Sequence, residues 1–188
     1  MKKLFLIALI GFVNLAMNAQ DDNATAQINF YFQIPAISIL DLQRTGTDDP
    51  ISFSLEAPTE AGESFIFPDP NTDQWLNYTV MRESTTTKKK ISVKLSSAMP
   101  PGLRLKIEAI AASSNGIGTM GTGIPGIFVS LVDQVLINDI GTSATGDGVD
   151  NGHNLKYTLQ PSTDAEAYAM LTADNYGTKT ITYTMSDD

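Results

Sequence analysis

The sequence predicts an all-β fold, a single sandwich of about nine antiparallel strands, on three observations. Apolar and polar residues alternate with a period of two in several segments, as in strands that bury one face. Gly, Pro, Asn and Asp separate these segments at short intervals, which is typical of turns between strands. Amphipathic periodicity of the helical kind is not convincing in any segment.

The strands are expected wherever the alternation is clear, and less firmly where it is short or interrupted. The clear segments are Ile28–Ile34, Ile37–Leu40, Ile91–Leu95, Leu103–Ile107, Leu155–Leu159 and Ile181–Met185. The weaker segments are Ile51–Leu55, Ser64–Phe67, Trp75–Met81, Phe128–Ile137 and Ala165–Leu171, the last of which also fits a helical turn. Two segments rich in Gly, residues 113–126 and 141–152, are predicted to be loops.

The N-terminus has the features of a signal peptide. Lys2 and Lys3 precede an apolar run, residues 4–13, and Ala19 is a small residue at a suitable cleavage position. The run is short for a bilayer span, and no second one follows. We therefore expect residues 1–19 to be removed, with cleavage after Ala16 as the alternative because Met17 is large for its position. Residues 20–188 then form one domain that is secreted, periplasmic or at the cell surface, with no membrane span.

The charge of the chain excludes some classes of partner. Removal of residues 1–19 takes away two lysines and no acidic residue, so 10 basic and 21 acidic residues remain and the formal net charge is −11. Nucleic acids and anionic lipids need a positive surface, so neither is expected as a partner. The chain has no cysteine, which excludes disulfides, thiol nucleophiles and thiolate metal sites.

One glycine motif resembles a nucleotide-binding signature. Residues 116–121 match G-x-G-x-x-G, which binds a dinucleotide only between a strand and a helix. Gly123, Pro125 and Gly126 follow, so no helix can begin in register, and we interpret the motif as a flexible loop without a cofactor.

The single histidine, His153, is the natural candidate for a catalytic base. A hydrolytic triad would also need an activated serine, and the G-x-S-x-G motif is absent. His153 follows a run rich in Gly, Asp and Asn, so a solvated loop histidine is the expected reading. No catalytic residue is assigned, and the protein is not expected to be an enzyme.

The same run raises the possibility of calcium. Asp147, Asp150 and Asn151 offer oxygen ligands of the kind Ca²⁺ takes, with Asp139 near in sequence. Their spacing is not that of an EF-hand, and Asp and Asn are also ordinary turn residues. The three residues are therefore weak calcium candidates, and no metal or other cofactor is assigned.

The first and last clear strands carry a resemblance to a known group of proteins. The segment Gln27–Asp41 resembles the first strand, and Tyr176–Met185 the last strand, of secreted immunoglobulin-like β-sandwich proteins of Gram-negative bacteria. The middle segments also fit, so the chain is similar to the spore coat protein U-like and chaperone–usher pilin-like families. The resemblance implies an immunoglobulin-like sandwich, although those families often carry a disulfide that this chain lacks.

The resemblance also implies a mode of assembly. Pilins of that type lack one strand and receive it from a neighbouring subunit. Ile28, Phe30, Phe32 and Ile34 would then form a donor strand, and the protein would self-associate by strand exchange. In the alternative, favoured from the sequence, the same residues form the first strand of a self-complete domain.

The expected function is that of an exported, non-catalytic structural or adhesive protein, such as a pilin-like fibre or cell-surface subunit, whose partners are its own copies or other surface proteins. The alternative is an extracellular ligand-binding module that takes a glycan or calcium at its Gly-rich and Asp-rich loops.

Overall fold

The computed structural model of the protein describes residues 27–46 and 50–188. The residues from Ile34 to Asp188 form one compact unit, and the part of the chain before it is considered separately. The expected signal peptide, residues 1–19, lies outside the described residues.

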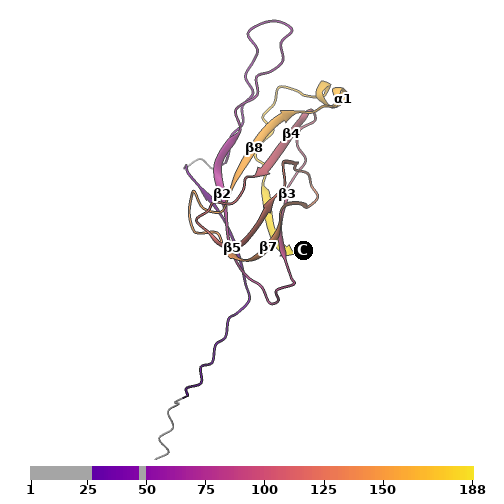
Figure 1. Cartoon of the computed structure of the whole chain (residues 1–188). Coiled ribbons are helices and arrows are strands. Elements are labelled where there is room, and N and C mark those ends of the chain that lie inside the picture. The colour runs from indigo at the N-terminus through magenta and orange to yellow at the C-terminus, as the bar shows by residue number, and fades with distance from the viewer. Residues whose placement is uncertain (1–26, 47–49) are drawn as a thin grey trace, which may run out of the picture. The chain divides into compact units, whose positions relative to one another are not determined.

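The described residues of the compact unit form nine antiparallel strands and one short helix, and Figure 1 labels several of them. The strands are β1 (Ile37–Arg44), β2 (Asn71–Met81), β3 (Lys89–Leu95), β4 (Leu103–Ala109), β5 (Ile117–Gly123), β6 (Ile127–Phe128), β7 (Gln134–Ala144), β8 (His153–Pro161) and β9 (Ile181–Asp187). The helix α1 (Ala165–Ala169) is capped by Asp164, whose carboxylate accepts the backbone N–H groups of Glu166 and Ala167. Within residues 27–46 and 50–188, no helix is long and apolar enough to cross a membrane.

The strands form one continuous hydrogen-bonded sheet in the order β6-β4-β8-β2-β7-β3-β9. In addition, β1 pairs with β2 and β5 pairs with β7. Strand β7 joins the two halves of this sheet, since it pairs with β3 as far as Ile140 and with β2 at Ser143 and Ala144. The change of partner lies next to Asp139, whose backbone has a φ of 59°.

One core is shared by both halves of the sheet. Most of its members alternate along their strands, as expected when each strand buries one face, whereas β7 contributes two consecutive residues, Leu136 and Ile137. The core residues are Leu76, Tyr78 and Val80 on β2, Ile91, Val93 and Leu95 on β3, Leu105, Ile107 and Ala109 on β4, Leu136, Ile137 and Ile140 on β7, and Leu155 and Tyr157 on β8, with Val129 before β7. The predicted all-β fold of about nine strands is thus confirmed, since the described residues form nine antiparallel strands in a sandwich-like fold.

Most of the strands expected from alternation are present, and the exceptions have physical causes. Residues 129–133 interrupt the segment Phe128–Ile137, because Ser130 forms hydrogen bonds with Gln134 and Val132 that close a turn. The segments Ile51–Leu55 and Ser64–Phe67 are not strands, and only an isolated bridge between Glu56 and Ile66 joins the chain near them.

The Gly-rich loop expected at residues 113–126 is wrong, since it contains β5. Glycine there permits close packing on β7: a Cβ atom at Gly118 would lie 2.1 Å from the carbonyl oxygen of Thr142. Residues 141–152 were also expected to be a loop, and β7 extends into them as far as Ala144.

The expectation of a half-buried strand at Ile28–Ile34 is also corrected. The structure assigns no strand from Gln27 to Ala36, and the first strand begins at Ile37. Alternation shows which face of a segment is suited to burial, but a strand also requires a paired neighbour, which the sequence pattern does not reveal.

Candidate functional site

Within the described residues, four strands of the compact unit pair with one neighbour only, namely β1, β5, β6 and β9. Strand β9 pairs with β3, and β1 pairs with β2; within the described residues no strand pairs with the other edge of either one. Strands β1 and β9 approach each other without forming a ladder. An unpaired edge presents a row of free backbone donors and acceptors, which makes it a site for adding another strand.

Apolar side chains beside these edges are incompletely covered. Ile181, Tyr183 and Met185 alternate along β9 and pack against the core while remaining partly exposed, as does Leu40 on β1. Their cross-strand neighbours on β3 are fully enclosed core residues. The core is therefore less well covered along β9 than along β3.

The segment from Gln27 to Ala36 has the complementary features. Its four alternating apolar side chains are largely exposed: Ile28 is 76% exposed, Phe30 72%, Phe32 82% and Ile34 71%. A row of large apolar side chains without cover in water is unfavourable by about 1.5–3 kcal/mol for each side chain relative to burial. These are the four residues selected from the sequence as an interaction strand.

An open cavity of about 380 Å³ lies at one end of β1 and β9. It is lined by Ile37 at the start of β1, by Arg82 and Lys89, and by Asp187 at the end of β9. The lining is mixed in charge, so this end of the site is more polar than the apolar row along β9.

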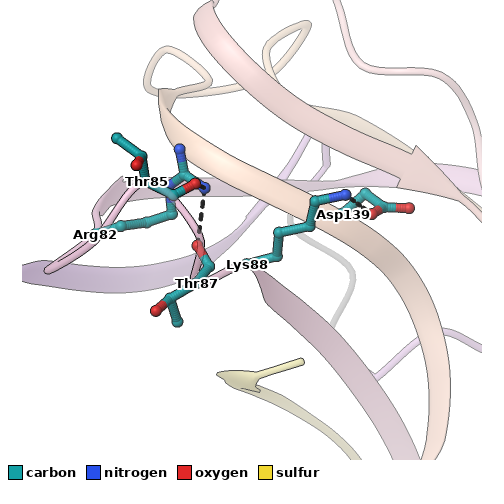
Figure 2. Close-up of polar contacts among 5 residues, drawn as sticks. All are labelled: Arg82, Thr85, Thr87, Lys88 and Asp139. Carbon is teal, nitrogen blue, oxygen red and sulfur yellow. Dashed lines mark hydrogen bonds and ion pairs between the residues drawn. The ribbon is translucent and has the colours of Figure 1, made fainter.

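The loop that borders this cavity is held by hydrogen bonds to its own backbone. The guanidinium group of Arg82 donates to the carbonyl oxygens of Thr85, at 3.0 Å, and Thr87, at 2.8 Å, and Figure 2 shows the bond to Thr87 as a dashed line. In the same view Lys88 forms an ion pair with Asp139, near the bend of β7. The loop between β2 and β3 is therefore tied both to itself and to β7.

The other two lysines of the run 88–90 are paired as well. Lys89 lies 2.6 Å from Asp187, and Lys90 lies 3.4 Å from Asp188, so both bind the C-terminal end of β9. Such partly exposed pairs contribute little stability, about 0–1 kcal/mol each. Their role is positional, since they reinforce the register of β9 on β3.

His153 occupies a place opposite to the one expected from the sequence. It is the first residue of β8 and is 0% exposed, so the prediction of a solvated loop histidine is wrong. Its Nδ1 lies 2.7 Å from the Ile110 carbonyl oxygen, and its Nε2 lies 3.1 Å from the Met120 carbonyl oxygen and 3.0 Å from the Tyr78 hydroxyl. The run of Gly, Asp and Asn before His153 predicts a loop, but this run ends just before β8 begins. His153 therefore belongs to the strand and not to the loop.

The Tyr78 hydroxyl completes this buried polar group. It donates to the Met120 carbonyl oxygen and contacts the histidine ring. Burial raises the pKa of Tyr78 well above its ordinary value. Carbonyl oxygens only accept hydrogen bonds, so His153 and Tyr78 supply the donors that satisfy the backbone of Ile110 and Met120. We interpret the group as a link between β2, β5 and β8.

A second pair of buried hydroxyls lies beneath β9. The hydroxyl oxygens of Tyr157 and Tyr183 are 2.7 Å apart. Burial raises the pKa of Tyr157 to about 12 and raises that of Tyr183 well above 10. This hydrogen bond joins β8 to β9 across the core and holds the edge strand in place.

The loop that contains the weak calcium candidates is held by hydrogen bonds of the Asn151 side chain. The Asn151 amide group donates to the carbonyl oxygens of Asp147 and Val149, and its own oxygen accepts from Asn115. Asp150 adopts a left-handed backbone with a φ of 63°, as turn residues do. Among the described residues, no group of three or more His, Cys, Asp or Glu side chains is placed to hold a metal ion.

Comparisons with known proteins identify no relative. No family model, no curated protein and no solved structure matches the chain.

The sequence thus predicted the apolar row of Ile28–Ile34, but it did not predict the partly exposed apolar face of β9. The partly exposed face of β9 could not be found in advance, because alternation in Ile181–Met185 looks the same in an edge strand and in a central strand. The buried pairs of His153 and Tyr157 were likewise missed, since their partners are distant in sequence.

Proposed function

We propose that this protein is an exported, non-catalytic structural subunit that assembles by adding a strand to the unpaired edge of β9. The observation that carries the proposal is the match between this edge and the segment Gln27–Ile34. The β9 edge has unpaired backbone groups beside partly exposed apolar side chains, and the segment has four exposed apolar side chains in alternation. Strand addition would pair the backbone groups of the edge by hydrogen bonds and would bury alternate side chains of the added strand in pockets.

Apolar burial is the main favourable contribution to the proposed association, about 6–12 kcal/mol for four large side chains. The backbone hydrogen bonds of the new ladder add to it. Export through the leader at residues 1–19 and a pilin-like or adhesive role at the cell surface belong to the same proposal.

The test is the oligomeric state of the exported product of the full chain, measured by light scattering over a range of concentrations. The double substitution of Phe30 and Phe32 by Ser removes half of the apolar row, and we expect it to abolish the concentration-dependent rise in mass. Tyr31→Ser is the matched control, because it removes an aromatic side chain from the opposite face of the same segment. If the wild type remains monomeric throughout, or if the control loses assembly to the same extent, the proposal is wrong.

A further inference from the structure

We propose that Asn115 is a site of spontaneous deamidation, and that the fold protects the second Asn-Gly pair, Asn151-Gly152, from the same reaction. Asn115 precedes Gly116 in the turn that leads into β5, and Asn151-Gly152 lies just before β8. No other Asn-Gly pair occurs in the sequence. Neither pair belongs to β9 or to the segment Gln27–Ile34, so the modification does not depend on the assembly proposed above.

The reaction needs only the chain itself and water. The backbone nitrogen of Gly116 attacks the side-chain Cγ of Asn115, so that a nitrogen–carbon bond forms and the bond between Cγ and Nδ2 breaks. The proton of the backbone nitrogen leaves with Nδ2, and ammonia is released. Water then opens the resulting cyclic imide at either carbonyl carbon, which gives an aspartyl or an isoaspartyl residue. Glycine as the second residue favours the attack, because it has no Cβ to hinder the approach and its backbone is unusually free.

The two Asn-Gly pairs lie against each other, although the asparagines are 36 residues apart in sequence. Nδ2 of Asn115 donates to Oδ1 of Asn151 at 3.2 Å, and the backbone N–H of Ser113 donates to the Gly152 carbonyl oxygen at 2.8 Å. These two bonds join the loop before β5 to the loop before β8. Because the two asparagines are neighbours, a difference in their reactivity has to come from how each side chain is held.

The side chain of Asn151 is held by the backbone of its own loop. Its Nδ2 donates to the carbonyl oxygens of Asp147, at 2.7 Å, and Val149, at 3.2 Å. Its Oδ1 accepts from Asn115. Both polar atoms on Cγ are therefore engaged, and rotation of Cγ toward the nitrogen of Gly152 would break these hydrogen bonds.

The side chain of Asn115 is held by a single contact. Asn115 is exposed in its turn, and among the described residues its side chain forms a hydrogen bond with Asn151 only. The two glycines do not account for the difference, because an added Cβ atom would clash at both Gly116 and Gly152. Loss of one exposed hydrogen bond leaves Cγ of Asn115 able to rotate toward the nitrogen of Gly116. The first step of the reaction is therefore easier at Asn115 than at Asn151.

Deamidation of Asn115 would reverse the contact between the two loops. The amide nitrogen donates, whereas a carboxylate at position 115 only accepts hydrogen bonds at neutral pH. This carboxylate would face Oδ1 of Asn151, which is also an acceptor in the contact. The modified protein would carry one more negative charge, and only the bond from Ser113 to Gly152 would still join the loops.

Peptide mapping by mass spectrometry tests the proposal. The purified product of the full chain is incubated at mildly alkaline pH, in native buffer and in parallel in urea sufficient to unfold it. Conversion of amide to acid is then followed with time at Asn115 and Asn151. In urea we expect both asparagines to convert at similar rates. In native buffer we expect Asn115 to convert and Asn151 to convert at least about tenfold more slowly, because its bonds to Asp147 and Val149 must break first.

Two variants serve as matched controls. Asn115→Gln keeps an amide, but its longer side chain does not readily form the cyclic imide, so conversion at position 115 should stop while Asn151 stays protected. Asn115→Asp carries the product carboxylate from the start. It should show faster amide hydrogen exchange in residues 113–116 than Asn115→Gln, because the contact with Asn151 is lost.

Each outcome of the mapping decides the proposal. Conversion of Asn115 without Asn151 in native buffer supports it. If both asparagines convert in urea but neither does in native buffer, the fold protects Asn115 as well and the assignment of the site is wrong. If both convert equally fast in native buffer, or Asn151 converts first, the protection of Asn151 is wrong. If neither converts even in urea, the sequence does not undergo the reaction and the whole proposal fails.

Discussion

The buried contact between His153 and two backbone carbonyls offers a quantitative test of how the sheet is held together. The substitution His153→Leu replaces the ring with an apolar side chain of comparable size and removes both nitrogens. The Ile110 carbonyl, 2.7 Å from Nδ1, then loses this donor, whereas the Met120 carbonyl keeps the Tyr78 hydroxyl. The substitution therefore removes the donor to the Ile110 carbonyl oxygen and the hydrogen bond between His153 and the Tyr78 hydroxyl.

The expected loss of stability follows from these two contacts. A buried acceptor left without a partner costs about 1–3 kcal/mol, and an ordinary buried hydrogen bond contributes about 0.5–1.5 kcal/mol. His153→Leu should therefore lower the free energy of unfolding by about 2–4 kcal/mol. Tyr78→Phe should cost about 1–3 kcal/mol, because it removes the donor to the Met120 carbonyl oxygen, and a neutral imidazole that donates from Nδ1 to Ile110 has no proton on Nε2 to replace it.

The assay is urea-induced unfolding followed by tryptophan fluorescence, at a concentration at which the protein is monomeric. Trp75 is the single tryptophan and lies on β2, three residues before Tyr78. Tyr31→Phe is the matched control, since it removes a hydroxyl from a side chain that is 87% exposed and should leave the midpoint unchanged. A loss below about 0.5 kcal/mol for His153→Leu would show that these hydrogen bonds do not stabilise the fold.

Three further predictions concern the core and its backbone. Burial raises the pKa of Tyr157 to about 12 from 10, so the contribution of its neutral hydroxyl to stability is fully present below pH 10 and is lost as the pH rises through 12. Unfolding midpoints measured from pH 9 to 12 test this prediction, and a constant midpoint contradicts it. Gly121→Ala should be more destabilising than Gly148→Ala by about 1–3 kcal/mol. Both glycines have a positive φ, but of the two only Gly121 lies where an added Cβ atom would meet backbone, 2.4 Å from a carbonyl oxygen. Equal losses of stability in thermal unfolding would contradict the clash. Leu136→Ala, in the core, should cost about 2–5 kcal/mol, whereas Leu131→Ala, at an exposed turn, should stay within about 0.5 kcal/mol in the same denaturation assay; similar values would show that the core is misplaced.

Much of the fold was accessible from local pattern. The alternation in Ile91–Leu95, Leu103–Ile107, Leu155–Leu159 and Ile181–Met185 correctly identified strands and their buried faces, because the period of two is a direct consequence of the pleat. The glycine-rich strand β5 could not be found in this way. Its glycines have no side chains to alternate, and their purpose is visible only in the close approach to β7.

The candidate site likewise has one part that could be predicted from the sequence and one part that could not. The sequence by itself determined that Ile28, Phe30, Phe32 and Ile34 form an apolar row, since this needs only their spacing. Only the tertiary structure decided that β9 has an unpaired edge, because edges arise from the order of strands in a sheet. It likewise decided that His153 is buried: its hydrogen-bond partners lie 33 to 75 residues away in sequence, and no local pattern records such distances.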